Sequence, residues 1–290
     1  MTRLIGRTSD QLDEVIRAHR FTIAFVFPTV GAILLIASAE GIVPDVLAFH
    51  PVLLLLGIVV IRSPILAGIL PVLNRRVLAI LGVLVGYTYA IEYIGVQTGI
   101  PYGDFEYGIG IGPMIGEIPL LLPLLFVPLA INAYLIVRLT VTTDRIGPIA
   151  SIPVLGSAVA MLIAIDFVLD PGAVALGFWV FDGNGTYYGV PWTNYAGWVL
   201  SATVAIVFVH LAFARSSLID RGRRCEFILD DLVSFTILWG MVNGYYGNTI
   251  PVVVALVIIS WLWRIGRLDA ITIPNSSTRN LVQSGRWSRK

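Results

Sequence analysis

The sequence is poor in charge, cysteine and histidine. Only 13% of its 290 residues are charged and 57% are hydrophobic, whereas soluble domains carry about 25% charged residues. The net charge of +1 provides no field that would attract nucleic acid. One cysteine, Cys225, excludes an intramolecular disulfide, and three widely spaced histidines form no metal site. The acidic pair Asp230-Asp231 lacks the second acidic motif of a Mg²⁺-dependent prenyl-diphosphate enzyme. We therefore expect an all-α, polytopic membrane protein without a metal.

Long apolar runs follow one another along the chain, each near the roughly 20 residues that cross a bilayer as a helix. We predict a bundle of about eight such helices. The short apolar stretch 63–74 is expected to form a half-helix or a loop. The chain then divides into an N-terminal segment (1–20), a single transmembrane catalytic domain (21–265) and a polar basic tail (266–290). The predicted spans are residues 21–39, 45–61, 77–96, 118–137, 147–168, 195–214, 227–246 and 249–263.

The basic residues fall on one side of this topology. All 19 lie before the first predicted span, after the last one, or in every second connection between spans. Arg62 is placed in the connection between the second and third spans. Cytoplasmic segments carry the excess of Lys and Arg, so we expect both chain ends to be cytoplasmic. Basic residues before an apolar run also occur in cleaved signal peptides, but the acids of the leading segment argue against that reading.

Two outward connections, 97–117 and 169–194, are long and rich in glycine, proline and aromatic residues, and they contain no basic residue. Long loops in compact proteins tend to be functional. We interpret the segment from Gly99 to Pro119 as a lid over a site at the outward ends of the helices.

Polar residues lie in the spans directly beneath these loops. Glu92 and Asp166 are each about one turn from the outward end of a span. Asp170 follows Asp166 on the same face if the helix continues that far, and Asn194 opens the sixth span. Carboxylates at mid-bilayer cost about 2.5–3.5 kcal/mol on insertion scales, so even shallower ones need a reason. Either hydrogen bonds from tyrosines and loop amides hold them as structural groups, or they carry chemistry.

The clustering of polar groups at one depth, which includes His50 and Asn243, favours chemistry. Burial disfavours the charged form of a carboxyl group, so such a group can act as a general acid. Protonation of a trisubstituted alkene gives a tertiary carbocation, which aromatic faces and a second carboxylate stabilise. Addition of water then gives Markovnikov hydration, whereas exclusion of water gives cyclisation. The residues alone leave open acid chemistry on an apolar substrate and proton-coupled transport.

Two stretches carry longer motifs. In residues 92–124, Glu92 is followed by TGIPYG, an aromatic-rich segment and GEIPLLLP. In residues 166–198, DFVLDP is followed by GFW, YYGVP and NYAGW. These stretches resemble the signature regions of the membrane carotenoid-biosynthesis hydratases, of the bisanhydrobacterioruberin hydratase and γ-carotene hydratase type. The resemblance extends over most of the chain, from about residue 20 to residue 265.

The resemblance implies a multi-pass hydro-lyase of the cell membrane that needs no cofactor. Such an enzyme adds water to the terminal C=C bonds of an acyclic C50 carotenoid. Its partners would be the carotenoid, water, membrane lipids and other carotenoid-biosynthesis enzymes. A carotene cyclase or other acid-catalysed isoprenoid enzyme remains an alternative, as does a proton-coupled transporter.

The residue roles follow from depth, residue type and the resemblance. We expect Glu92 or Asp166 to be the general acid, with Asp170 as its partner and Asn194 positioning the water. The acids of the first loop, Asp104, Glu106 and Glu117, are less clearly part of the family pattern. The aromatic residues expected to line the site and shield the cation are Tyr102, Tyr107, Trp179, Tyr187 and Trp198.

Overall fold

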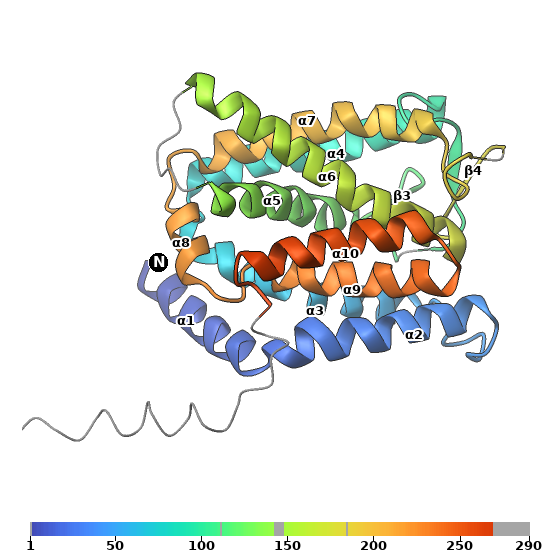
Figure 1. Ribbon diagram of the computed structural model, residues 1–290, viewed down its shortest axis with the longest axis horizontal. Helices are drawn as coiled ribbons and strands as arrows, with labels where there is room; N and C mark the ends of the chain where they lie inside the picture. Colours follow the sequence, from blue (N-terminus) through green and yellow to red (C-terminus); the bar gives the residue numbers. More distant parts are fainter. Residues whose placement is uncertain (1, 111, 142–147, 184, 269–290) are drawn as a thin grey trace, which may run out of the picture.

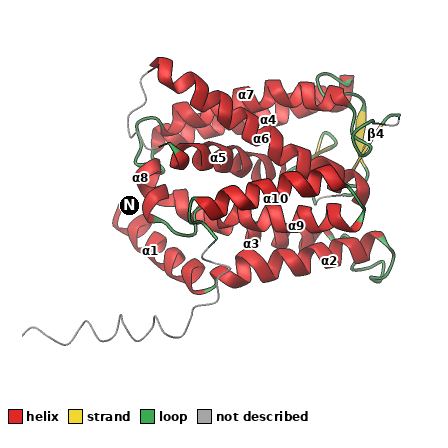
Figure 2. Cartoon of the chain, in the orientation of Figure 1, coloured by secondary structure: helices red, strands yellow, loops and turns green. Residues whose placement is uncertain are grey.

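The protein is a bundle of helices lying side by side, with small strands at one end (Figures 1 and 2). The computed structural model describes residues 2–110, 112–141, 148–183 and 185–268, and the side chains of 2–8 and 148–150 are not described. The predicted tail lies outside the described residues from 269 onward. The described ends of the chain lie at the same end of the bundle as α8, opposite the strands. The all-α class is confirmed.

The elements follow in chain order. The α-helices of the described residues are α1 (Thr2–Ala18), α2 (Phe27–Ala39), α3 (Pro51–Ile69), α4 (Arg75–Thr98), α5 (Leu122–Thr140), α6 (Pro148–Leu176), α7 (Trp192–Phe213), α8 (Leu218–Arg224), α9 (Asp230–Tyr245) and α10 (Thr249–Arg264). A π-helical turn, Thr22–Val26, precedes α2, and a 3-10 turn, Leu70–Val72, follows α3. The strands are β1 (Phe105–Tyr107), β2 (Met114–Ile115), β3 (Ile118–Pro119) and β4 (Trp179–Phe181).

Six helical stretches of the described residues are long and apolar enough to cross a membrane, namely Thr22–Ala39, Pro51–Val72, Arg75–Thr98, Leu122–Thr140, Ser151–Leu176 and Trp192–Phe213. They correspond to the first six predicted spans. The predicted seventh and eighth spans correspond to α9 and α10, which have 16 residues each. The chain is therefore an all-α membrane bundle.

The second predicted span was placed wrongly. It begins at Pro51 rather than at residue 45, and it continues through residues 63–69, which therefore form no separate half-helix. His50 is the N-cap of α3, and its Nδ1 accepts a hydrogen bond from the Val52 N–H at 3.3 Å. Pro64 does not end the helix, although its missing N–H leaves the Val60 carbonyl without its helical donor. The Ser63 hydroxyl donates to that carbonyl at 2.7 Å.

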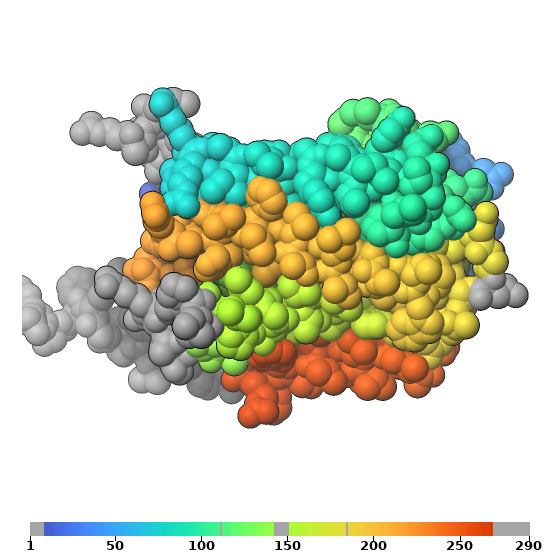
Figure 3. Space-filling view, turned by 90° about the horizontal axis from the view of Figure 1, so that it is seen from above, coloured from blue at the N-terminus to red at the C-terminus, as the bar shows by residue number. Residues whose placement is uncertain are grey.

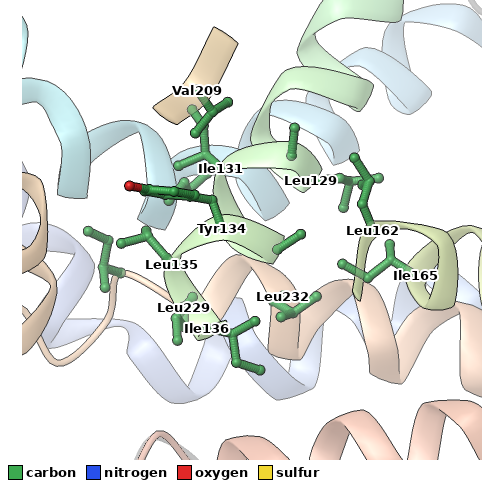
Figure 4. Packing of buried hydrophobic residues seen from close by; sticks show 14 of the residues in the cluster. Leu129, Ile131, Tyr134, Leu135, Ile136, Leu162, Ile165, Val209, Leu229 and Leu232 are labelled. Carbon is green, nitrogen blue, oxygen red and sulfur yellow. The ribbon is translucent and has the colours of Figure 1, made fainter. Parts of the chain in front are cut away.

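The core surrounds α5, which is apolar on all sides and buried along most of its length, as expected of a helix without a polar face. Figure 4 shows its side chains meeting those of the neighbouring helices. Ile131 and Leu135 of α5, Ile165 of α6, Val209 of α7 and Leu232 of α9 are all fully buried. This contact holds the four helices in fixed positions around the centre of the bundle.

Buried ion pairs tie the N-terminal half to α9. Arg20 Nε lies 2.8 Å from Asp230 Oδ2, and Arg62 Nη1 lies 2.8 Å from Asp231 Oδ1. The second oxygen of Asp231 accepts a hydrogen bond from the Asn132 amide. Buried charges of this kind are tolerated because they are paired. The prediction that Arg62 lies in a connection is therefore wrong, because Arg62 lies within α3. The acidic pair Asp230-Asp231 is bound by arginines.

The two long connections that were predicted to face outward meet in a two-stranded antiparallel sheet at the end of the bundle. β1 pairs with β4 in the register Phe105–Phe181, Glu106–Val180 and Tyr107–Trp179. Gly99, with φ of +70°, ends α4 in the left-handed conformation that glycine favours and turns the chain toward β1. The sheet lies over the ends of the spans (Figure 1), in the position predicted for a lid.

Candidate active site

A cavity of about 550 Å³ lies beneath the β1–β4 sheet, within the range typical of small-molecule sites. It has two parts. The polar end is formed by α4, α5, α6, α7 and the loops that carry β1 and β4, and an apolar arm extends between α2, α3 and α9. Three of the four predicted catalytic residues, Glu92, Asp170 and Asn194, line the polar end. The fourth, Asp166, does not.

Glu92 projects from the last turns of α4 and is half-buried, because it faces the cavity. Its Oε1 accepts a hydrogen bond from the hydroxyl of Tyr107 on β1. Burial and the nearby Glu92 carboxyl raise the pKa of Tyr107 well above its ordinary value, so the phenol stays protonated and remains a donor. The contact links the lid directly to the first acid. It also stabilises the carboxylate form of Glu92.

Asp170 lies on α6, one turn beyond Asp166. The helix continues through both residues, so the expected i, i+4 arrangement is confirmed. The amide of Asn194, in the first turn of α7, donates a hydrogen bond to Asp170 Oδ2. Both side chains are buried and both line the cavity. The two signature stretches are therefore brought together at one point, with Glu92 from the first and Asp170 and Asn194 from the second.

Asp166 lies behind this wall. It is 2% exposed, and neither of its carboxyl oxygens has a hydrogen-bond partner among the described residues. The buried hydroxyl of Tyr195 likewise has none. Asp170 follows Asp166 by one turn of α6, so a proton shared between the two carboxyl groups would give Asp166 a partner. Two carboxyl groups that share a buried site commonly hold one proton between them.

The pleat of the small sheet directs the aromatic residues. Because side chains of a strand alternate between its faces, Phe105 and Tyr107 of β1 face the cavity together with their partners Phe181 and Trp179. The intervening Glu106 is exposed. Asp104 and Glu117 do not line the cavity either, and Glu117 instead accepts a hydrogen bond from Gln97 at 3.1 Å. The emphasis on the aromatics of this loop rather than on its acids agrees with the geometry.

Tyr102 and Trp198 complete the aromatic lining. The Tyr102 hydroxyl lies 2.6 Å from Ser201 Oγ on α7. Its ring fits between two glycines: a Cβ on Gly95 would lie 2.9 Å from the ring, and a Cβ on Gly197 would lie 2.7 Å from it. Both positions therefore require glycine for this close approach. Trp198 packs against Phe126 with ring centroids 5.2 Å apart.

Tyr187, the fifth predicted aromatic, does not line the cavity. Pro171 lies inside α6 and has no N–H for the carbonyl of Phe167, four residues earlier. The Tyr187 hydroxyl donates to that carbonyl at 3.3 Å. The ring packs among Phe167, Trp192 and Tyr195. The expectation that Tyr187 lines the site is thus wrong, because the proline in α6 creates a structural need for its hydroxyl.

Two other polar residues expected at this depth differ in their surroundings. His50 lines the cavity through its position at the start of α3. Asn243 is buried outside it, where its amide donates to the Val168 and Trp239 carbonyls at 2.7 and 2.8 Å.

The sequence interpretation missed several residues of the cavity wall. Thr88 precedes Glu92 by one helical turn, and Ser201 follows Asn194 by about two turns. Helical periodicity from the predicted acids could have found both. Arg62 reaches the wall from α3, where it contacts Asp231 and the Leu125 carbonyl. Local sequence gives no signal for that contact.

Comparison with known proteins connects this site to a family. Residues 49–262 match the family described as carotenoid biosynthesis protein. The chain belongs to this family. It is 48% identical over 260 residues to the bisanhydrobacterioruberin hydratase of Haloarcula japonica, a match that covers 89% of this chain and 87% of that protein. No solved structure matches the chain. The resemblance of the two signature stretches is confirmed, and all of the polar end of the cavity lies within the matched residues.

Proposed function

We propose that the protein is a carotenoid hydratase. It adds water to the terminal C=C bond of an acyclic C50 carotenoid of the bisanhydrobacterioruberin type. The observation that carries the proposal is a cavity, in a chain of this family, whose apolar aromatic walls end at carboxyl groups. In the described part of the chain, no ion pair involves Glu92, Asp166 or Asp170. Such groups can hold and release protons next to a hydrocarbon.

In the proposed first step, the proton held by the Asp166–Asp170 pair passes from Asp170 to the less substituted carbon of the terminal double bond. The π electrons form the new C–H bond, and the positive charge develops on the tertiary carbon. The faces of Tyr102, Trp179 and Trp198 stabilise that charge. We assign the acid to Asp170 rather than to Asp166 because Asp170 lines the cavity.

In the second step, a water molecule attacks the tertiary cation. Its oxygen forms the C–O bond, and Glu92 accepts the proton that it loses. The Tyr107 hydrogen bond suits Glu92 to this role, because it favours the carboxylate. The Asn194 amide positions the water beside Asp170. Return of the proton from Glu92 to Asp170 restores the enzyme, so the net reaction adds one water and needs no cofactor.

The proposal also covers the membrane topology of the protein and its surroundings in the cell. All eight predicted spans cross the cell membrane, both chain ends are cytoplasmic, and the polar end of the cavity lies near the outer face. The division into a leading segment, a catalytic domain and a tail belongs to this proposal, as do contacts with lipids and with other carotenoid-biosynthesis enzymes.

Deletion of the gene followed by mass analysis of the pigments tests the function. Hydration predicts that the deletion strain accumulates a carotenoid lighter by one water for each end that the enzyme hydrates. Accumulation of an isomer with unchanged mass would instead indicate a cyclase. An unchanged pigment profile would contradict any role in carotenoid synthesis and would favour a transporter.

A further inference from the structure

The apolar arm of the cavity runs between two helices that scarcely touch each other. α2 packs mainly against α9, whereas α3 packs against α9, α1 and α5. Val30 and Leu34 lie one turn apart on the cavity face of α2, and Leu53 and Gly57 lie one turn apart on that of α3. The arm is thus a furrow with hydrocarbon walls that leads away from the acid cluster.

The two ends of the cavity differ in exposure. The residues Val30, Leu34, Leu47 and Leu53 line the arm and yet are 47–54% exposed. At the polar end, Tyr102, Asp170 and Asn194 are 3–5% exposed. The face formed by α4, α7, α6 and α10 is a continuous surface (Figure 3). The cavity is therefore more enclosed at Asp170 and Asn194 than along the arm, whose exposed residues lie on α2, on α3 and in the connection between them. A bilayer would cover this side.

We propose that the opening between α2 and α3 is the lateral passage for the substrate's hydrocarbon chain. The proposal rests on the proposed function. The terminal alkene reaches the acids, and the polyene passes along the furrow into the lipid. A C50 polyene is about as long as the bilayer core, roughly 30 Å, whereas a cavity of about 550 Å³ encloses a drug-sized molecule. Part of the chain must therefore lie outside the cavity.

This arrangement has a consequence for the product. One end of the carotenoid occupies the closed end of the cavity while the other end remains in the bilayer. A substrate with two reactive ends has to leave, reverse and bind again. The singly hydrated carotenoid is therefore released and appears before the doubly hydrated one.

Gly57 offers a way to narrow the passage without disturbing the core. It lines the arm, and a Cβ at this position meets no atom within 4 Å. A Cβ on Gly86 of α4 also meets no atom within 4 Å, but Gly86 is exposed and does not line the cavity. Both glycines are inside helices, where a larger side chain improves helix propensity by comparable amounts. Gly86 is therefore a matched control.

The test is a series of Ala, Leu and Trp substitutions at Gly57 and at Gly86, with each protein reconstituted in lipid vesicles that contain the C50 carotenoid. Hydration is measured by product mass, and carotenoid binding by the change in its absorption spectrum. We expect both to fall as the side chain at 57 grows, with at least a tenfold loss of hydration for Gly57→Trp. The Gly86 series should stay within twofold of the wild type, and the thermal midpoint should stay equal or rise by similar amounts in the two series.

Equal hydration and binding throughout the Gly57 series, or the same decline in both series, would contradict the proposed passage between α2 and α3. So would a doubly hydrated product that forms without a free singly hydrated intermediate. Failure of the proposed function gives a different result, since the wild-type protein would then bind carotenoid without hydrating it or would not bind it at all.

Discussion

The molecule contains two buried groups of carboxyls that differ in their partners. In the inner group, Asp230 and Asp231 each contact an arginine at 2.8 Å. In the outer group, the partners found among the described residues are neutral: Tyr107 donates to Glu92, and Asn194 donates to Asp170. The difference separates acids that fix the fold from acids that can exchange protons.

The physical basis is the cost of a buried charge. A guanidinium compensates a buried carboxylate, and removal of either partner leaves an isolated charge. The charge of the inner acids is therefore compensated in the folded protein. A phenol or an amide compensates a carboxylate only partly, so an outer acid can be either charged or neutral. General acid–base chemistry requires that freedom.

The largest effect is expected from the outer acids. Glu92→Gln and Asp170→Asn, made separately, remove a proton acceptor and a proton donor while keeping the shape of the side chains. Each should lower hydration by about 10²–10⁴-fold, the usual contribution of general acid–base catalysis. The measurement is the ratio of hydrated to unhydrated carotenoid in membranes with equal amounts of protein. Normal hydration by both variants would remove the outer acids from the mechanism.

Substitutions in the inner group should change the stability of the protein. Arg20→Met removes the guanidinium that contacts Asp230 at 2.8 Å and should cost about 3–5 kcal/mol of stability, as for other broken buried pairs. The readout is the thermal midpoint in detergent. Arg20→Met combined with Asp230→Leu should recover most of the loss, because no charge is then isolated. A stable single variant that has lost hydration would contradict the division between the two groups.

A smaller effect is expected from substitution of a glycine that allows the Tyr102 ring to pack closely. Gly197→Ala places a Cβ 2.7 Å from the Tyr102 ring and from the Pro101 carbonyl oxygen. The ring must shift, and displacement of a group in an active site by about 1 Å can cost up to about 10²-fold. We expect about a tenfold loss of hydration. Gly86→Ala is the control in open space, and equal activities of the two variants would show that the position of Tyr102 has no influence.

Two tyrosines form the last contrast. Tyr107→Phe removes the donor to Glu92 and should lower hydration about tenfold, since hydrogen bonds to charged groups contribute about 1.5–3 kcal/mol. Tyr187→Phe removes a hydrogen bond to a backbone carbonyl and should cost about 1 kcal/mol of stability with hydration per folded molecule unchanged. Rates and thermal midpoints of both proteins distinguish the roles. The reverse pattern would assign the catalytic contact to Tyr187.

The helices and the outer acids could be predicted because their signals are local. Apolar length identifies the first six spans, and Glu92, Asp170 and Asn194 combine depth, residue type and family motif. The sequence favoured Glu92 or Asp166 as the acid, with Asp170 as its partner. It could not show which of the two aspartates faces a cavity, because residues four apart on a helix differ in direction by only about 40°. Packing against α7 decides which one faces the cavity.

The errors arose where a distant contact overrides local chemistry. Arg62 has the sequence signature of a helix end, and its partner Asp231 lies 169 residues away. Because Asp231 compensates the charge of Arg62, α3 continues past Arg62. Tyr187 has the composition of an active-site aromatic, but the carbonyl that Pro171 leaves without a donor takes its hydroxyl. Both outcomes depend on tertiary contacts that a motif does not contain.

The central claim is that carboxyl groups protonate a carbon atom and that water supplies the hydroxyl group. It is tested most directly by running the purified wild-type protein with its carotenoid in D₂O and, separately, in H₂¹⁸O, and by analysing the product by mass spectrometry and NMR. The mechanism predicts one deuterium on the carbon next to each new carbinol and one ¹⁸O in each new hydroxyl. Oxygen derived from O₂, or a product without carbon-bound deuterium, would contradict it.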